Sequence, residues 1–326
     1  MISQFAKGVI AIRPINFAYN REAAEDNDFM IDPLNKKINQ NSSPEQINQL
    51  INMKAKRKHF EYMMNINTCR INTMIFDQVN PIAYDSVWPD WFTTHKSDNI
   101  PEGVLIIYPM KTHSRRLEKD QNIINKLRSE YKYFIDLSYL ENKNIFVEGK
   151  GSVIFDNANN KLFCSLSKRT NLIGVETLKN ELDKISKIPW KVVTFTSHNA
   201  ESKVIYHTDC VFQLLDKHAV ICLESISEDF RKNLIDELCD INKNSKKIYE
   251  IIEINFKEMQ SMCANILNVK NDQNENVILM STKAFSNYSQ QNLDILSKNY
   301  KILSSNISIF EKVGGGSARC LLAEHF

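Results

Sequence analysis

The residue best suited to act as a nucleophile is Cys320, in the C-terminal segment GGGSARCLLAEHF (314–326). Three consecutive glycines before it allow the backbone to come close to a ligand. Arg319 stands beside the cysteine, and a neighbouring cation lowers the pKa of a thiol. Local sequence alone slightly favours a buried structural cysteine, so a nucleophilic role depends on an acid–base partner within hydrogen-bond reach.

The best candidate for that partner is His207, in the segment YHTDCVF (206–212). It begins an apolar run typical of a strand, and Asp209, two residues on, falls on the same face of a strand. A histidine alone on a strand is usually a core residue. The His-x-Asp pattern on one face strengthens the prediction of an acid–base role.

Two further carboxylates stand in apolar surroundings. Glu148, in FVEGKGS, ends an apolar run directly before Gly149 and Gly151, and Asp90, in VWPDW, lies between aromatic residues. Burying a carboxylate is unfavourable unless it binds a cation or a hydrogen-bond donor. A turn-capping glutamate and an Asx turn are the structural alternatives for these two positions.

The spacing of the four candidates favours the functional interpretation. Asp90 and Glu148 are 58 residues apart, Glu148 and His207 are 59 apart, and His207 and Cys320 are 113 apart, close to twice that interval. Successive repeats that each present one polar group at an equivalent position would give this spacing. We therefore predict that the four side chains converge in one cavity.

The elements that would position these residues also repeat. Residues 145–195 and 204–254 both predict two strands, a helix and a strand, and no long Pro-, Ser- or Gly-rich linker divides the chain, so we expect a single domain over residues 1–326. Ser43, Pro44 and Gln46 form a capping-box pattern that begins a helix. Helices are expected near 44–64, 119–130, 175–185, 227–239 and 286–297, and the expected strands include 72–76, 104–108, 277–280 and 307–310.

Composition excludes several classes of function. The chain has 326 residues, with 41 Lys and Arg against 39 Asp and Glu, which argues against a strongly basic nucleic-acid binder. The basic run KAKRKHF (54–60) is interpreted as the solvated face of a helix. No apolar run is long enough to span a membrane, and no signal peptide is expected. Seven cysteines without a CxxC pair argue against disulfides and structural zinc, and favour a reducing cytoplasm.

Common cofactor and hydrolase motifs are also missing from the sequence. There is no GxGxxG, GxxxxGK[ST], HExxH or GxSxG pattern. We therefore expect no cofactor and no metal. The expected partner is a small molecule, and a homodimer is the default expectation for the assembly.

Several strings together resemble the amidinotransferase superfamily of guanidino-group-modifying enzymes, nearest to its arginine-deiminase-like and citrulline-utilisation hydrolases. The resemblance covers nearly the whole chain and implies a five-bladed, pseudo-symmetric α/β propeller. The strings are IRPINFAYNREAAEDNDF (12–29), VWPDWFTTH (87–95), YPMKTHSRRLEK (108–119), EGKGSVIFD (148–156), SKRT (167–170), YHTDCVF (206–212) and GGGSARC (314–320).

This resemblance implies a role for each candidate residue. Cys320 matches the nucleophile, His207 the general acid and base, and Glu148 the carboxylate that orients the histidine. The implied substrate-binding residues are Asp90, Asp209, Arg169 and one of Arg115 and Arg116. The chain departs from the closest hydrolases in two places, since the stretch around Asp90 is one residue shorter and Asp209 replaces an asparagine.

The predicted function is hydrolysis of a C–N bond at the guanidino or ureido carbon of arginine, a methylarginine or citrulline. Two facing carboxylates, Asp90 and Asp209, favour a cationic guanidinium over a neutral ureido group. The alternatives are an amidinotransferase, which shares the covalent half-reaction, and a propeller that binds a ligand without catalysis. The complete set of reactive residues argues against the last.

Overall fold

The strands of the molecule form five sheets of three strands each. The structure is a computed structural model that describes residues 4–34, 43–239 and 246–326. In spatial order the sheets are β15 (Ala323–His325), β1 (Gly8–Arg13) and β2 (Asn72–Asp77); β3 (Phe92–His95), β4 (Val104–Ile107) and β5 (Tyr133–Asp136); β6 (Val153–Asp156), β7 (Lys161–Ser165) and β8 (Lys191–Phe195); β9 (Phe212–Leu214), β10 (His218–Ile221) and β11 (Glu250–Glu253); and β12 (Leu267–Lys270), β13 (Asn276–Ser281) and β14 (Lys301–Ser305).

All five sheets share one plan. The middle strand pairs antiparallel with the first strand and parallel with the third. A parallel pair needs a crossover, and each crossover contains a helix: α2 (Pro44–Thr68), α4 (Gln121–Arg128), α6 (Leu172–Asp183), α7 (Glu228–Cys239) and α10 (Gln290–Asn299). The strand-strand-helix-strand unit predicted for 145–195 and 204–254 is therefore confirmed. It occurs four times along the described chain, and in the fifth sheet β15 supplies the missing first strand from the other end of the chain.

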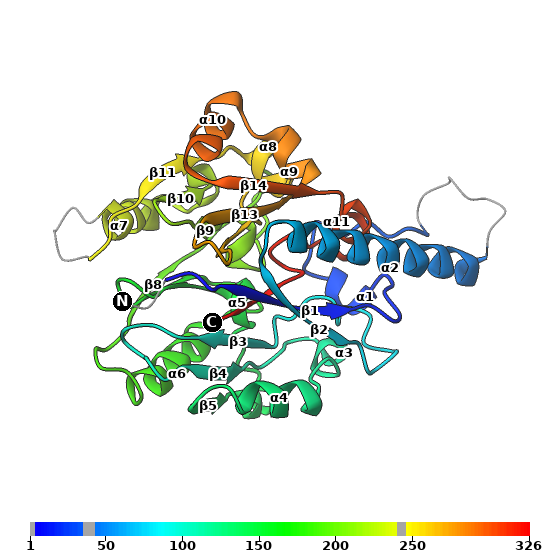
Figure 1. The fold of residues 1–326 in the computed structure, drawn as a ribbon, viewed down its shortest axis with the longest axis horizontal. Helices are drawn as coiled ribbons and strands as arrows, with labels where there is room; N and C mark the ends of the chain where they lie inside the picture. Colours follow the sequence, from blue (N-terminus) through cyan, green and yellow to red (C-terminus); the bar gives the residue numbers. More distant parts are fainter. Residues whose placement is uncertain (1–3, 35–42, 240–245) are drawn as a thin grey trace.

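One of the five sheets joins the two ends of the chain. The C-terminal strand β15 pairs antiparallel with β1, with Gly8 opposite His325 and Ile10 opposite Ala323. In Figure 1 these strands lie near the centre, while α4 and α6 lie at the lower edge, α7 at the left and α10 at the top. The pairing brings the segment before β15 into the interior, where Cys320 lies.

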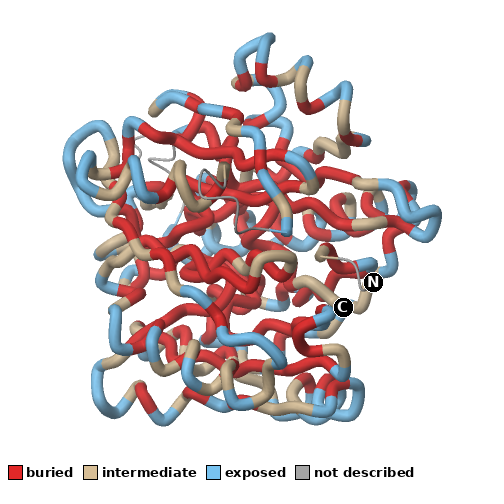
Figure 2. The backbone as a smooth tube through the Cα atoms, turned by 90° about the vertical axis from the view of Figure 1, so that its left-hand side faces the viewer, coloured by how far each residue is buried: buried red, intermediate tan, exposed pale blue. Residues whose placement is uncertain are grey.

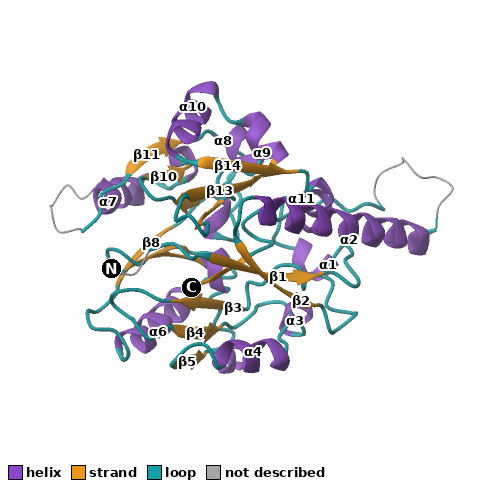
Figure 3. Cartoon of the chain, viewed as in Figure 1, coloured by secondary structure: helices purple, strands orange, loops and turns teal. Residues whose placement is uncertain are grey.

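The remaining helices are short and lie in the connections. They are α1 (Arg21–Ala24), α3 (His113–Arg116), α5 (Gly149–Ser152), α8 (Phe256–Gln260), α9 (Thr282–Asn287) and α11 (Ser308–Gly314). Short 3₁₀ turns cover 138–143, 208–210 and 223–225. Figure 3 shows the helices around the strands.

Helix α2 begins as the sequence predicts. The Ser43 side chain accepts from the backbone N–H of Gln46, and the Gln46 side chain accepts from the backbone N–H of Ser43. The helix runs four residues beyond its expected end, to Thr68. None of the helices in the part of the chain that the structure describes is both long and apolar enough to cross a membrane.

The strand expected at 307–310 is wrong, because α11 begins there. The side chain of Asn306 accepts hydrogen bonds from the backbone N–H and the hydroxyl of Ser308, a local pattern that starts a helix. Gly315, in the left-handed conformation with φ of 67°, ends the helix. The apolar run at this position reflects burial of one helix face and not a strand.

Buried apolar side chains from the strands and the crossover helices form four core clusters. In Figure 2 most of the buried stretches run through the interior, and the exposed ones lie mainly at the edges. Trp91 and Phe92 are fully buried at the start of β3, and Leu321 and Leu322 are fully buried before β15. The packed core therefore holds in place the segments that carry Asp90 and Cys320.

Candidate active site

The candidate residues occupy equivalent places in the sheets. Asp90 stands two residues before β3, Glu148 and His207 each stand five before β6 and β9, and Cys320 stands three before β15. Each therefore lies in the segment that leads into the first strand of its sheet. This shared position explains the regular spacing in the sequence, and the structure brings all four residues together.

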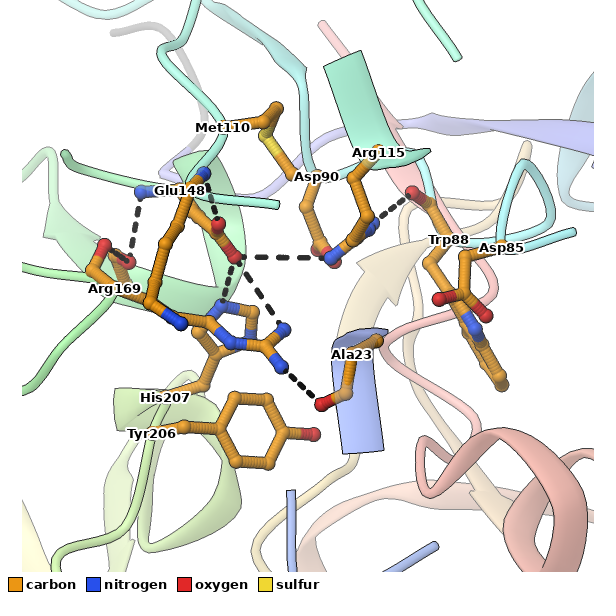
Figure 4. A network of polar contacts seen from close by, with 12 residues as sticks. Ala23, Asp85, Trp88, Asp90, Met110, Arg115, Glu148, Arg169, Tyr206 and His207 are labelled. Carbon is orange, nitrogen blue, oxygen red and sulfur yellow. Dashed lines mark hydrogen bonds and ion pairs between the residues drawn. The ribbon is translucent and has the colours of Figure 1, made fainter. Parts of the chain in front are cut away.

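His207 and Glu148 form a buried pair. Their side chains are 3 % and 0 % exposed, and His207 Nε2 lies 3.0 Å from Glu148 Oε2. The second oxygen of Glu148 accepts from the backbone N–H of Lys111 at 2.7 Å. Burial alone would raise the pKa of Glu148, but Arg169 and His207 hold the pKa below its usual value. The carboxylate stays charged and can orient the imidazole, as Figure 4 shows.

The first glycine cluster makes room for this pair. Gly149 has a φ of 47°, and a Cβ added there would lie 1.9 Å from the carbonyl oxygen of Asp90. A Cβ on Gly151 would lie 2.3 Å from Nδ1 of His207. Both positions therefore require glycine, the first for its backbone conformation and the second for the close approach of the imidazole.

Cys320 lies in a polar setting of its own. Its sulfur is 3.0 Å from Asn265 Nδ2 and 3.6 Å from Asp209 Oδ2. Asn265 Oδ1 accepts from the backbone N–H groups of Arg319 and Cys320, at 3.2 and 3.3 Å. Asn265 therefore holds both the backbone and the sulfur of the candidate nucleophile.

The expectation that Arg319 lowers the pKa of the Cys320 thiol is wrong. Burial and then Asp209 raise that pKa well above its usual value, and the opposing effect of Lys150 is smaller. The Arg319 guanidinium instead faces Asp209 Oδ2, 3.8 Å away, and Glu324, 3.7 Å away. Adjacency in sequence did not place the cation next to the sulfur, and burial together with Asp209 favours the neutral thiol.

Asp90 is already paired with cations of the protein itself. The prediction that Asp90 and Asp209 together need a cationic substrate is therefore not supported at Asp90. Its Oδ1 is 2.7 Å from Lys150 Nζ, and its Oδ2 is 3.1 Å from Arg115 Nη2. Burial alone would raise the pKa of Asp90, but Lys150 and Arg115 hold it well below its usual value. The second carboxylate, Asp209, has a pKa raised by burial. The chain therefore supplies its own counter-ion at this position.

The two candidate arginines 115 and 116 differ in position. Arg115 is buried and reaches Glu118 at 2.8 Å and Glu148 at 3.8 Å. Arg116 is 27 % exposed and donates to the backbone carbonyls of Met110 and Lys111. Only Arg115 of this pair lines the cavity with the other candidates.

Arg169 lies on the other side of Glu148. Its Nη1 is 3.6 Å from Glu148 Oε2, its Nε donates to Asp26 at 2.8 Å, and its Nη2 donates to the carbonyl of Ala23 at 2.7 Å. The guanidinium also stacks over the ring of Tyr206, with its carbon 4.5 Å from the ring centroid. These contacts hold the guanidinium at the wall of the cavity.

A small cavity connects these groups. Five of the predicted residues line it: Asp90, Arg115, Arg169, His207 and Cys320. Glu148 and Asp209 do not line it, but Glu148 contacts His207, Arg115 and Arg169, and Asp209 contacts Cys320. Among the described residues, no group of three or more His, Cys, Asp or Glu side chains could hold a metal ion. The arrangement suits nucleophilic attack by a thiol with acid–base help from a carboxylate-bound imidazole.

Two residues at the site were missed as site residues by the sequence argument. Asn265 is not among the candidates of the sequence analysis, although it lies 58 residues after His207, the interval that the other candidates already defined. It also stands two residues before β12, the first strand of the fifth sheet. The only feature of the sequence that marks Lys150 is its position between Gly149 and Gly151. Nothing in the local sequence identifies Asp90 as its partner.

Comparison with known proteins gives matches in family and in fold. The family model described as N,N dimethylarginine dimethylhydrolase, eukaryotic, matches residues 13–326. No curated protein matches the sequence at a significant level.

Solved structures match over nearly the whole chain at low identity. The N-terminal domain of ArgZ, an arginine dihydrolase from the ornithine-ammonia cycle in cyanobacteria, bound to substrate, has a TM-score of 0.69 at 15 % identity, covering 97 % of both chains. A dimethylarginine dimethylaminohydrolase in adduct with S-methyl-L-thiocitrulline has a TM-score of 0.62 at 16 % identity, covering 98 % of this chain and 100 % of that one. Apo ArgZ is longer, and the chain spans 40 % of it, with a TM-score of 0.68 at 16 % identity over 97 % of this chain.

Proposed function

The chain belongs to the eukaryotic N,N dimethylarginine dimethylhydrolase family, within the amidinotransferase superfamily, and we propose that it hydrolyses a C–N bond at a guanidino or ureido carbon. The substrate is a small arginine-like amino acid: arginine, a methylarginine or citrulline. The observation that carries the proposal is the buried His207–Glu148 pair, whose imidazole lines one cavity with Cys320 in a chain of this family.

The reaction begins with attack by the Cys320 sulfur on the central carbon of the substrate. His207 accepts the thiol proton as the S–C bond forms, and then gives it to the nitrogen that leaves as ammonia or an alkylamine. Glu148 keeps the imidazole oriented and stabilises its charged form, since its own pKa is held low.

Water completes the reaction. His207 takes a proton from the water that adds to the carbon of the covalent adduct, and the S–C bond then breaks. The proton returns to the sulfur, which restores the neutral thiol. The reaction needs no oxidant, reductant or metal for its balance.

The remaining charges suit an amino-acid substrate. Arg169 and Arg115 are the candidates for binding its α-carboxylate, because both guanidinium groups line the cavity. Asp85 also lines the cavity, is 3 % exposed, and its Oδ1 has no hydrogen-bond partner among the described residues. A buried carboxylate oxygen without a partner suits the α-ammonium group of the substrate.

The proposal extends to the domain organisation, the cellular compartment and the alternative reaction. The five sheets would be the blades of one pseudo-symmetric propeller that forms a single domain over residues 1–326. All seven cysteines are free thiols, which suits a reducing cytoplasm in which Cys320 stays reactive. An amidinotransferase is the second candidate, because an amine in place of water would complete the same covalent half-reaction.

Product analysis tests the proposal. Arginine, mono- and dimethylated arginines, citrulline and agmatine are each incubated with the protein, and amino-acid and amine products are quantified, with Cys320→Ser as the control. Ammonia or an alkylamine released without an added amine acceptor supports the hydrolase. Turnover only with an amine acceptor would favour the transferase, and no Cys320-dependent product from any substrate would contradict both.

A further inference from the structure

The proposed mechanism assigns no role to the ion pair between Lys150 and Asp90. Lys150 is 2 % exposed, and its ammonium group contacts Asp90 Oδ1 at 2.7 Å and the backbone carbonyl of Cys320 at 3.0 Å. Arg115 occupies the other oxygen of Asp90. The carboxylate that lines the cavity beside the nucleophile is therefore already neutralised by two cations.

Asp209, the other carboxylate near the sulfur, does not offset the positive charge of Lys150 and Arg115. Asp209 faces the Arg319 guanidinium at 3.8 Å, and it does not line the cavity. The unpartnered oxygen of Asp85 is the candidate for binding the α-ammonium group. A guanidinium that entered beside Cys320 would thus add a positive charge next to Lys150 and Arg115, and Asp90, the cavity carboxylate that these two cations contact, is already paired. Two like charges in a buried site repel each other strongly, because little water screens them.

Resting on the proposed hydrolase function, we propose that Lys150 is a specificity-determining residue that favours a neutral ureido group over a cationic guanidinium. It acts by neutralising Asp90, so it is a positioning residue and does not itself need to touch the substrate. A ureido group adds no net charge, and its nitrogens can still donate to Asp90 and its oxygen can accept.

The chemistry of a ureido substrate also benefits from a cation at this place. Attack by sulfur on the ureido carbon moves an electron pair onto the oxygen, and the resulting oxyanion is stabilised by a fixed positive charge nearby. The charge of Lys150 acts at the sulfur, where it opposes the rise of the thiol pKa.

The steps that follow balance with water as the only co-reactant. The oxyanion re-forms the carbonyl as the terminal nitrogen leaves as ammonia with the proton from His207. Water then releases an N-carboxylated amine from the sulfur. This carbamate loses carbon dioxide, so citrulline would give ornithine, carbon dioxide and ammonia.

The test compares kcat/KM for citrulline and for arginine in the full chain and in three variants. Lys150→Met removes the charge at similar length, and Lys150→Arg keeps it. Lys111→Met is the matched control, because Lys111 pairs with a different carboxylate, Asp26, at 2.8 Å. The unaltered protein should prefer citrulline, and Lys150→Met should shift the ratio towards arginine by about tenfold or more, as expected for removal of one partner of a buried charge pair.

The controls separate specificity from general damage. Lys150→Arg should restore most of the citrulline preference, and Lys111→Met should leave the ratio unchanged. Calorimetric titration of arginine and citrulline into the Cys320→Ser protein measures the preference without turnover, and it applies even where Lys150→Met does not fold. A preference for arginine in the unaltered protein, or a ratio that Lys150→Met does not change, would overturn the role of Lys150 and leave the hydrolase intact. Neither turnover nor binding of either compound would overturn both proposals.

Discussion

Two buried histidines lie in contrasting surroundings. His207 and His95 are 2 % and 4 % exposed, yet only His207 pairs with a carboxylate, Glu148 at 3.0 Å. His95 contacts the Thr93 hydroxyl at 2.9 Å and stacks on Phe155 with 3.7 Å between ring centroids. Its Nδ1 has no hydrogen-bond partner within the described chain, and burial, with Arg319, lowers its pKa to about 3.

The difference extends to the groups around each ring. The residues around His207 are joined by ion pairs to Glu148. The small cavity next to His95 is lined by three amide side chains together with Arg319 and Glu324, and among the described residues no carboxylate pairs with the His95 ring. Oxygen atoms of Gln4, Asn157 and Gln213 in that cavity have no hydrogen-bond partner among the residues described. Burial alone removes the charge from an imidazole, and a network of fixed opposite charges is needed to keep a proton-transfer group functional in the interior. The surroundings of His207 therefore suit the proposed acid–base role, and those of His95 suit packing.

The largest expected effect comes from removing the proposed nucleophile, Cys320, which lines the same cavity as His207. Cys320→Ser should reduce turnover by several orders of magnitude, because a hydroxyl is a far weaker nucleophile than a thiolate at neutral pH. The fold should persist, since one atom changes. Steady-state kinetics and a thermal melt check both statements. Cys239→Ser, at a half-buried cysteine outside the site, is the control that should keep activity. Full activity in Cys320→Ser would exclude the covalent mechanism.

Matched substitutions of the two histidines test the comparison directly. His207→Gln should lower kcat by about 10²–10⁴, the usual contribution of a general acid–base. His95→Gln should leave kcat nearly unchanged and lower the free energy of unfolding by about 0.5–3 kcal/mol. Both proteins are assayed for turnover and for denaturant unfolding. Equal losses of activity in the two variants would show that the carboxylate partner does not decide the role of the histidine.

A smaller loss of kcat is expected when His207 is retained but its imidazole is displaced by a neighbouring substitution. In Gly151→Ala the new Cβ would lie 2.3 Å from His207 Nδ1, so the imidazole must shift. A displacement of about 1 Å can cost about 100-fold in rate. Gly8→Ala is the control, since its Cβ would come no closer than 3.1 Å to another atom, the backbone oxygen of Asn72, and Gly8 does not line the cavity. Normal kcat in a folded Gly151→Ala protein would contradict the close packing.

The smallest expected effect is on stability in acid and concerns His95. Its pKa is near 6.5 in the unfolded chain and about 3 in the folded protein, so between these values only the unfolded chain binds the proton. Stability is therefore lost as the pH falls below 6.5, by up to about 1.4 kcal/mol per pH unit from this one group. His95→Gln should make the dependence of the unfolding free energy on pH between 6.5 and 4 less steep. An unchanged slope in the variant would show that His95 is not buried in its neutral form.

Local pattern predicted most of the elements and most of the reactive residues. The capping box at Ser43 gave the start of α2, and the repeated unit gave the order of strands and helices, because both depend on short-range backbone chemistry and on the period of apolar residues. The strands β1, β3, β12 and β15 were not predicted. β3 and β12 are short and mostly buried, β1 is buried over five of its six residues, and β15 has only three residues, so none of them shows the alternation that identifies a half-buried strand.

The sequence by itself determined which chemical groups are present and, through their regular spacing, that Asp90, Glu148, His207 and Cys320 belong together. Only the tertiary structure decided the charge of each group. It paired Asp90 with Lys150, turned Arg115 into the cavity and Arg116 out of it, and placed Asn265 in place of Arg319 against the sulfur. The reason is that spacing along a repeated fold is encoded locally, whereas ion pairing and the pKa of a buried group depend on distances between residues far apart in the chain.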